Sequence, residues 1–425
     1  MGPGDALRQQ GRTVAGDRRV TVRNALVVAQ VAVSLVLIVA AGLFMQTFAS
    51  LVRTPLGFEP SSLVIMNVDI KRSAASPATR QVLFERMREI AAAIPGVTGV
   101  SMSVITPVSG SGWNTSIQVG GGEARTAAPT EQTASRASER QRTMSWVNAV
   151  SAEWFKTYGM RLIAGRSFLP TDRAGSPAVA IVNEAFVQRF IPGGNPVGRV
   201  IGAGQIAGPG IDNFEIIGVV NNAIYRSTRS GHAPTMYVPL DQTGGSPSNL
   251  AFTLRAAVPE AQLHRQIDEA LRSADPAAAF TFRRMDDLVS ASTAQERVLA
   301  LLSGWFGGIA VLLAALGLYG VTCYSVTRRR AEIGIRIALG ADRSAVTRLV
   351  MRRVAALIGV GTVAGLLLSI WASRFVATLL FGLEPRDTWT FATAGAVLIG
   401  VGILAGWFPA RRAARTDPMH VLRGA

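Results

Sequence analysis

The clearest pattern along the chain is a set of four apolar runs, each long enough to cross a lipid bilayer. A helix needs roughly 20 mostly apolar residues to do this. The first run is interrupted only by Gln30 and Ser34, and the third contains Arg374 near its end, where a long side chain can reach the headgroups. Transmembrane helices are therefore predicted over 24–48, 298–326, 354–380 and 390–408.

The first run could instead be the apolar part of a cleaved signal peptide. It is about twice as long as is usual for such a segment, and Ala40-Ala41-Gly42 is a poor cleavage site. We therefore expect an uncleaved signal-anchor helix.

Each of the last three runs carries a pair of glycines four residues apart. Glycine at this spacing lets helix backbones approach closely in lipid. A chain with 43 glycines contains some such pairs by chance, but one pair in every span is less expected. Helix packing is therefore predicted at these positions. The pairs are Gly304 and Gly308, Gly361 and Gly365, and Gly402 and Gly406.

The segment between the first two spans has the mixed periodicity of an α+β domain. Amphipathic stretches alternate with short apolar runs and turn residues. Two stretches are predicted loops: 121–143, polar and mobile, and the glycine-rich 201–212. Helices are predicted at 77–94, 183–190 (capped by Asn183) and 259–273, and strands at 97–105, 178–182, 214–220, 235–240 and 249–254.

Charge placement predicts the orientation. The chain has a net charge of +16, and the segments 1–23, 327–353 and 409–425 carry +3, +6 and +3 of it. Short basic segments stay in the cytoplasm. Both termini and the loop between spans two and three are therefore expected on the cytoplasmic side of the membrane, and the large domain on the outer side. Because most of the excess charge flanks the membrane, nucleic acid is not needed to explain it.

The predicted fold class is a multi-pass α-helical membrane protein with four transmembrane helices and a large α+β extracytoplasmic domain between the first and second. The expected layout is a cytoplasmic segment 1–23, helix 24–48, an outer domain 49–297, helix 298–326, a cytoplasmic loop 327–353, helix 354–380, an external hairpin 381–389, helix 390–408 and a cytoplasmic tail 409–425.

The residues that carry catalysis in common enzyme classes are missing from the sequence. The chain has two lysines, Lys71 and Lys156, and neither follows a glycine, so it cannot contain the phosphate-binding loop of an ATPase. The three histidines lack metal-ligand spacing, and Cys323 is the single cysteine. The adjacent Asp286 and Asp287 lie just before the second span, where a solvated stalk is expected rather than a catalytic carboxylate pair. Gly202-x-Gly204 lacks the strand-turn-helix context of a phosphate-binding site. We expect no catalytic residue, metal or cofactor.

The loop after span two has an amphipathic pattern that the spans themselves do not require. Glu332 and Arg336 can pair across one helical turn, Ile333 and Leu339 lie on an apolar face, and Gly340 can end the helix. One interpretation is an interfacial helix that anchors span two. The other is a docking element for a cytoplasmic partner, and the pattern does not separate them.

Several motifs resemble the MacB/FtsX-like ABC transporter permease family. Span two ends in Leu316-Gly-Leu-Tyr-Gly-Val, followed by Arg329-Arg-Ala-Glu-Ile-Gly-Ile-Arg-Ile-Ala-Leu-Gly-Ala, as in the FtsX-like permease domain, which would cover about 298–418. In the large domain, Ala178-Val-Ala-Ile-Val-Asn-Glu-Ala-Phe and Phe214-Glu-Ile-Ile-Gly-Val-Val resemble the MacB-like periplasmic core. The matches run in order from about residue 23 to residue 421.

This resemblance implies a permease subunit of the bacterial inner membrane that transmits ATP-driven motion to its periplasmic domain, 49–297, for export or efflux. Its partners would be a cytoplasmic ABC ATPase dimer, a second permease half (the same chain or another), membrane lipid and, as further candidates, periplasmic proteins. Segments 46–53 and 285–298 would form a stalk. The residues implied in ATPase coupling are Glu332, Ile333, Gly334, Arg336, Ala338, Leu339, Gly340 and Ala341.

The sequence departs from the family pattern in one respect that leaves more than one interpretation open. MacB proteins carry their ATPase on the same chain. The motifs of this chain instead resemble most those of large permeases, notably of Acidobacteria, in which two permease halves are fused in one chain. This chain is then expected to be one half encoded alone or a truncated, inactive remnant. The resemblance is also compatible with an FtsX-like regulator of periplasmic enzymes and with a lipoprotein-release subunit.

Overall fold

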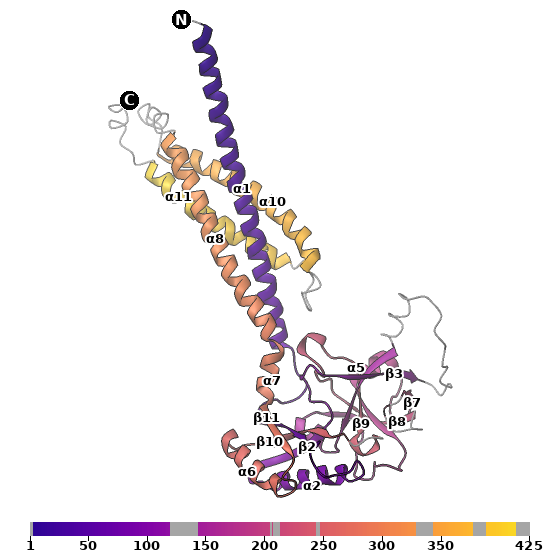
Figure 1. Cartoon of the computed structure of the whole chain (residues 1–425). Coiled ribbons are helices and arrows are strands. Elements are labelled where there is room, and N and C mark those ends of the chain that lie inside the picture. Colours follow the sequence, from indigo (N-terminus) through magenta and orange to yellow (C-terminus); the bar gives the residue numbers. More distant parts are fainter. Residues whose placement is uncertain are drawn as a thin grey trace. The chain divides into compact units, whose positions relative to one another are not determined.

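The computed structural model describes residues 3–119, 143–204, 206, 213–243, 247–328, 343–376 and 388–413. The chain divides into two compact units (Figure 1). One is made of Met1–Val52 and Gln295–Ala425, and the other is Arg53–Ala294.

The first unit contains four long apolar helices. They are α1 (Pro3–Arg53), α8 (Ala294–Arg328), α10 (Arg343–Val376) and α11 (Thr388–Ala413). Each is long and apolar enough to cross a membrane. Helix α10 already begins at Arg343, before the expected start of the third span, because arginines favour a helix and do not end one. The predicted hairpin 381–389 lies largely outside the described residues.

The first and last strands of the second unit form a four-stranded antiparallel region in the order β11-β1-β10-β2, which is one end of an eleven-stranded sheet. Its chain order is β1 (Leu63–Asp69), α2 (Arg80–Ala92), β2 (Val97–Ser103), then after a long insertion β10 (Asn249–Ala256), α6 (Glu260–Arg272) and β11 (Ala279–Arg284). This is the split β-α-β arrangement, with two strand-helix-strand units interleaved in one sheet.

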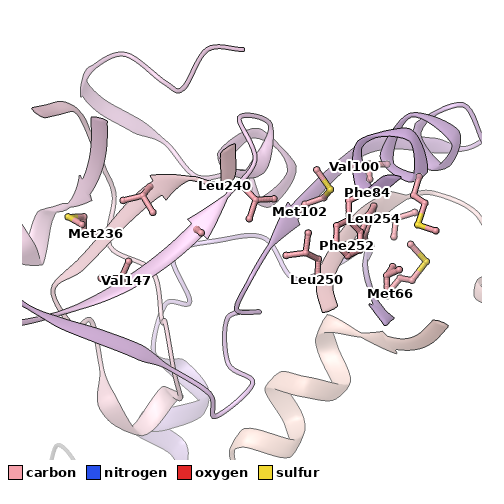
Figure 2. Packing of buried hydrophobic residues seen from close by; sticks show 14 of the residues in the cluster. Met66, Phe84, Val100, Met102, Val147, Met236, Leu240, Leu250, Phe252 and Leu254 are labelled. Carbon is pink, nitrogen blue, oxygen red and sulfur yellow. The ribbon is translucent and has the colours of Figure 1, made fainter. Parts of the chain in front are cut away.

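The core of this sheet lies under its two helices. Met66 of β1 is paired with Phe252 of β10, and Phe252 with Met102 of β2, so the three side chains share one face. Phe84 of α2 packs on Phe252, with ring centroids 6.1 Å apart (Figure 2). All four side chains are almost completely buried, as the alternation of apolar residues on β1 and β10 requires.

The insertion between β2 and β10 folds into a closed ring of six strands. The pairings run β4-β3-β7-β8-β6-β9, and β9 pairs back to β4. A closed ring leaves no long unpaired edge. The strands are β3 (Trp113–Val119), β4 (Met144–Val150), β6 (Val179–Asn183), β7 (Val200–Ala203), β8 (Asn213–Val220) and β9 (Thr235–Pro239), with β5 (Leu162–Gly165) paired outside the ring to β8.

Short helices complete the second unit. They are α4 (Trp154–Tyr158), α5 (Glu184–Phe190), α7 (Met285–Ser292) and the single 3₁₀ turns η1 (Thr228–Ser230) and η2 (Leu240–Gln242). Trp154 and Tyr158 of α4 form an aromatic cluster with Tyr237, on the face of the sheet opposite α2. A second core therefore fills the other side of this unit.

Several predicted elements of the second unit are confirmed. The predicted helices 77–94 and 259–273 correspond to α2 and α6, and all five predicted strands are present. Asn183 caps α5 as expected, because its Oδ1 accepts a hydrogen bond from the amide of Phe186 at 2.9 Å.

One prediction in this unit is wrong. The loop expected at 201–212 contains strand β7 up to Ala203, because Ile201 pairs with Val119 and fills the core of the ring. Within the predicted stalk segment 285–298, Thr293 separates α7 from α8, and the stalk itself stays a prediction. Residues 120–142, which hold nearly all of the other predicted loop, lie outside the described part.

Candidate functional site in the helix bundle

Two polar side chains of α1 hold it against α8. The Gln30 side-chain amide donates a hydrogen bond to the carbonyl of Leu313 at 2.6 Å, and the Ser34 hydroxyl donates to the carbonyl of Ala310 at 3.0 Å. In a bilayer no water is present to take their place, so such side chains bond across helices. The two polar interruptions of the first apolar run are therefore contacts between helices.

Helix α8 reaches α1 through glycines other than the predicted pair. A Cβ atom added at Gly307 would lie 3.2 Å from Ala41 Cβ, and one at Gly317 would collide with Gln30. A Cβ at Gly304 would meet only Met45 Cε, at 3.5 Å, and one at Gly308 would meet nothing within 4 Å. Within the described bundle, Gly304 therefore approaches only the end of the Met45 side chain, and Gly308 approaches no other helix.

The contacts between α1 and α8 continue towards both ends of the apolar region. The Arg23 guanidinium lies 4.0 Å from the centre of the Tyr324 ring, a cation–π contact at the basic end of the helices. At the other end of this region, Met45 of α1 lies beside Gly304 of α8. Residue numbers therefore rise along α1 while they fall along α8. The two helices are therefore antiparallel neighbours over the whole apolar region (Figure 1).

The other two glycine pairs lie at close helix contacts. A Cβ at Gly361 would lie 2.6 Å from Val31 Cγ1, and one at Gly365 would lie 2.8 Å from the carbonyl oxygen of Ala32, so α10 packs directly on the backbone of α1. On α11, a Cβ at Gly402 would collide with Ile358, and one at Gly406 would lie 2.9 Å from a methyl group of Val354, both on α10. These four positions have no room for a side chain.

Helix α11 is also fixed to α1 at the end where α1 leads into the soluble unit. The Thr390 hydroxyl donates a hydrogen bond to Gln46 Oε1 at 2.9 Å. A Cβ at Gly42 would lie 2.7 Å from the Thr390 methyl group. The described bundle is thus a four-helix arrangement in which α1 contacts the three other helices.

The residues implied in ATPase coupling lie outside the described part of the structure. The described chain ends at Arg328 on α8 and resumes at Arg343 on α10. The eight predicted positions between Glu332 and Ala341 fall in this interval. They stay a prediction.

The ionisable groups of the soluble unit have structural roles. Asp172 accepts hydrogen bonds from Arg166 at 2.7 and 3.1 Å and from the amide of Leu169 at 2.9 Å, and the guanidinium holds the pKa of this carboxyl below its usual range. Burial raises the pKa of Asp241, whose carboxylate accepts from Gln81. No group of three or more potential metal ligands occurs among the described residues.

Two family models match successive parts of the chain. The model described as the MacB-like periplasmic core domain matches residues 25–270, and the FtsX-like permease C-terminal model matches residues 304–418. The chain belongs to the MacB/FtsX-like permease family. With its four candidate membrane helices and the large α/β domain between the first and second, it has the expected architecture of a multi-pass inner-membrane permease.

Curated relatives of this permease are named as export proteins. It is 27% identical over 286 residues to the probable syringafactin export ATP-binding/permease protein SyfD of Pseudomonas syringae, covering 65% of this chain and 42% of the relative. It is 28% identical over 286 residues to the macrolide export ATP-binding/permease protein MacB of Salmonella typhimurium, with coverage of 65% and 43%. The permease spans about two fifths of the length of these relatives.

A solved structure is also similar to the permease. The periplasmic region of MacB from Actinobacillus actinomycetemcomitans covers 57% of this chain and 97% of its own, with 13% identity and a TM-score of 0.35. The matched permease domains are components of transporters, and neither family model is an ATPase domain.

Proposed function

We propose that this chain is the permease subunit of a MacB-like ABC export system, which transmits the ATP-driven motion of a separate ATPase to its soluble domain. The observation that carries the proposal is the hydrogen-bonded pairing of α1 with α8. These are the two helices from which the chain enters and leaves the Arg53–Ala294 unit. Because Gln30 and Ser34 tie them together, a displacement of one helix displaces the other.

The ATPase is proposed to bind at the loop between α8 and α10. The sequence of this loop has the amphipathic pattern of a docking helix, with Ile333 and Leu339 on its apolar face. The relatives are named as ATP-binding/permease proteins, whereas this sequence contains no phosphate-binding loop. ATP hydrolysis is therefore assigned to a partner chain, expected to act as a dimer on two permease copies or halves.

The orientation proposed for this subunit follows from its charge. The basic segments at both termini and between α8 and α10 would face the cytoplasm, and Arg53–Ala294 the periplasm. Export is supported by the relatives, which are named as export proteins. The large soluble unit favours this role over a regulator with a small outer domain.

Co-purification tests the coupling. The full chain, solubilised from cells that also express an ABC ATPase encoded beside it, is expected to recover that ATPase. Ile333→Asp and Leu339→Asp should each reduce recovery by more than tenfold, because a charge on the apolar face of the helix would disrupt its contact with the ATPase. Ser344→Asp adds the same charge at an exposed position nearby on α10 and should leave recovery unchanged.

Two results would refute this proposal. One is the absence of any recovered ATPase with the parent chain. The other is equal recovery with Ile333→Asp and with the Ser344→Asp control, because binding would then not use the apolar face of the loop.

A further inference from the structure

An apolar groove of about 730 Å³ runs along the outside of the α1–α8 pair. Met45 and Phe48 of α1 form one wall, and residues of α8 between Arg297 and Leu312 form the rest. The groove lies entirely within the membrane unit.

Two glycines that the packing of the bundle does not use form the floor of this groove. Gly304 and Gly308 both line it, and a Cβ at Gly308 would meet nothing within 4 Å. One helical turn apart on the same side of α8, they leave a hollow where side chains would otherwise stand. Trp305, with 73% of its surface exposed, stands beside the hollow.

The groove crosses the level at which the bilayer ends. The apolar part of α8, from Val298 onward, is longer than the roughly 20 residues that cross the hydrocarbon core. The second residue of α11 is Trp389, which is 79% exposed. Tryptophan favours the membrane–water interface, so this residue marks the level of that interface. The next residue, Thr390, bonds to Gln46, beside the groove residue Met45. Leu312 therefore lies on the hydrocarbon side of this level and Arg297 on the water side.

Arg297 is the charged residue that lines the groove. It has no hydrogen-bond or ion-pair partner among the described residues, so its guanidinium is available to a ligand. Guanidinium groups bind carboxylates and phosphates through two parallel hydrogen bonds. The groove thus combines an apolar channel with one cation at its polar end.

We propose that this groove binds a single-chain anionic amphiphile, with its acyl chain over Gly304 and Gly308 and its head at Arg297. From Arg297 to Leu312 the helix rises about 22 Å. At roughly 30 Å³ for each water-sized unit, the groove holds about two dozen non-hydrogen atoms, which is enough for one acyl chain and a head. This site goes beyond the proposed function, because binding needs no ATPase.

A second copy of the chain fits the groove less well than an amphiphile. Two copies inserted with the same orientation place their Arg297 residues at the same depth. A two-fold contact centred on the groove would bring these like charges together on the water side, and their repulsion would oppose the contact. An anionic head has the opposite charge and is attracted.

Tryptophan quenching in lipid nanodiscs tests the site. The purified full chain in zwitterionic phosphatidylcholine nanodiscs at pH 8 is titrated with 9,10-dibromostearic acid, whose bromines quench nearby indoles. Saturable quenching is expected, and Trp305→Phe should remove most of it. Gly308→Leu should weaken binding by more than tenfold because it fills the hollow. Gly400→Leu adds the same bulk on α11, where a Cβ also meets nothing within 4 Å, and should bind as the parent does.

The charged end is tested by changing the head of the ligand. Arg297→Gln should weaken binding of the dibromo acid about tenfold, as expected for one lost charge-assisted hydrogen bond, and should not change binding of its uncharged methyl ester. Gly308→Ala adds one methyl group in open space and should weaken binding by less than Gly308→Leu does, which separates groove filling from misfolding.

Three outcomes would overturn the proposal. Equal quenching of the Gly308→Leu and Gly400→Leu variants would place the ligand elsewhere. Equal loss of the acid and of the ester with Arg297→Gln would remove the role of the charge. A change of Gly308→Leu from dimer to monomer, without a change in quenching, would show that a second copy covers the groove. None of these results bears on coupling to an ATPase.

Discussion

At the scale of single residues, the sequence shows which groups are unusual but not what they contact. Gln30 and Ser34 stand out because they interrupt an apolar run, yet their partners are backbone carbonyls more than 270 positions away. No local pattern marks a carbonyl as an acceptor. Asn183 was predictable, because a cap bonds within its own turn.

The ion pair between Arg166 and Asp172 predicts a pH dependence of stability. The pKa of Asp172 is lowered in the folded state, so the pair stabilises the fold above the unfolded-state pKa of about 3.9 and loses this contribution as pH falls through the lower folded-state value. Asp172→Asn should cost about 1 kcal/mol at pH 7, measured by thermal unfolding, and the deficit should shrink below about pH 4.

The control for this experiment is an exposed pair. Asp268 and Arg272 lie one turn apart on α6, with both side chains about half exposed, and such pairs contribute little. Asp268→Asn should therefore leave the transition temperature almost unchanged at both pH values. A deficit for Asp172→Asn that stays constant down to pH 3 would show that the pair does not titrate as described.

At the scale of elements, the apolar periodicity predicts helices and central strands well and the strands of the closed ring less well. Strand β7 was missed because its glycine suggests a loop, whereas Gly202 pairs across the ring with Gln118. The glycine pairs of α10 and α11 lie at close helix contacts, whereas Gly304 and Gly308 of α8 lie largely outside them. Spacing fixes which residues share a face and not which face meets a neighbour.

Glycine positions on α10 give a matched test of packing in the bundle. A side chain at Gly365 would press on the backbone of α1, whereas Gly359 has nothing within 4 Å. Gly365→Val should lower the transition temperature of the detergent-solubilised chain, with a cost of about 1–3 kcal/mol typical of overpacking. Gly359→Val carries the same change in helix propensity without the clash. Equal transition temperatures for the two variants would contradict the packing of α10 on α1.

At the scale of the whole molecule, the order of spans and the large domain could be predicted from the sequence, because apolar runs of this length have few other uses. The interleaved sheet and the ring could not. Their pairings, such as Ser103 with Val150, join strands that are distant in the chain. The partner-binding role proposed for the loop between α8 and α10 is supported by sequence and family resemblance.

The proposed orientation can be measured with a single cysteine. Cys323→Ser removes the native thiol, and Ser111→Cys then places one on an exposed position of the soluble unit. A membrane-impermeant maleimide should label it in intact spheroplasts, because positive charge holds the termini inside. Ser344→Cys, near the start of α10 on the side expected to face the cytoplasm, is the control and should react only after lysis. Labelling in the reverse order would invert the topology.

The most direct test of the central claim is whether ATP bound to a partner moves the soluble domain. Spin labels on Ser111→Cys in the Cys323→Ser background report the distance between two copies of the chain by pulsed electron resonance. With the co-purified ATPase, adding ATP and vanadate should shift the distance distribution, and Ile333→Asp should prevent the shift. An unchanged distribution with nucleotide bound to the ATPase would contradict a role in transmitting its motion.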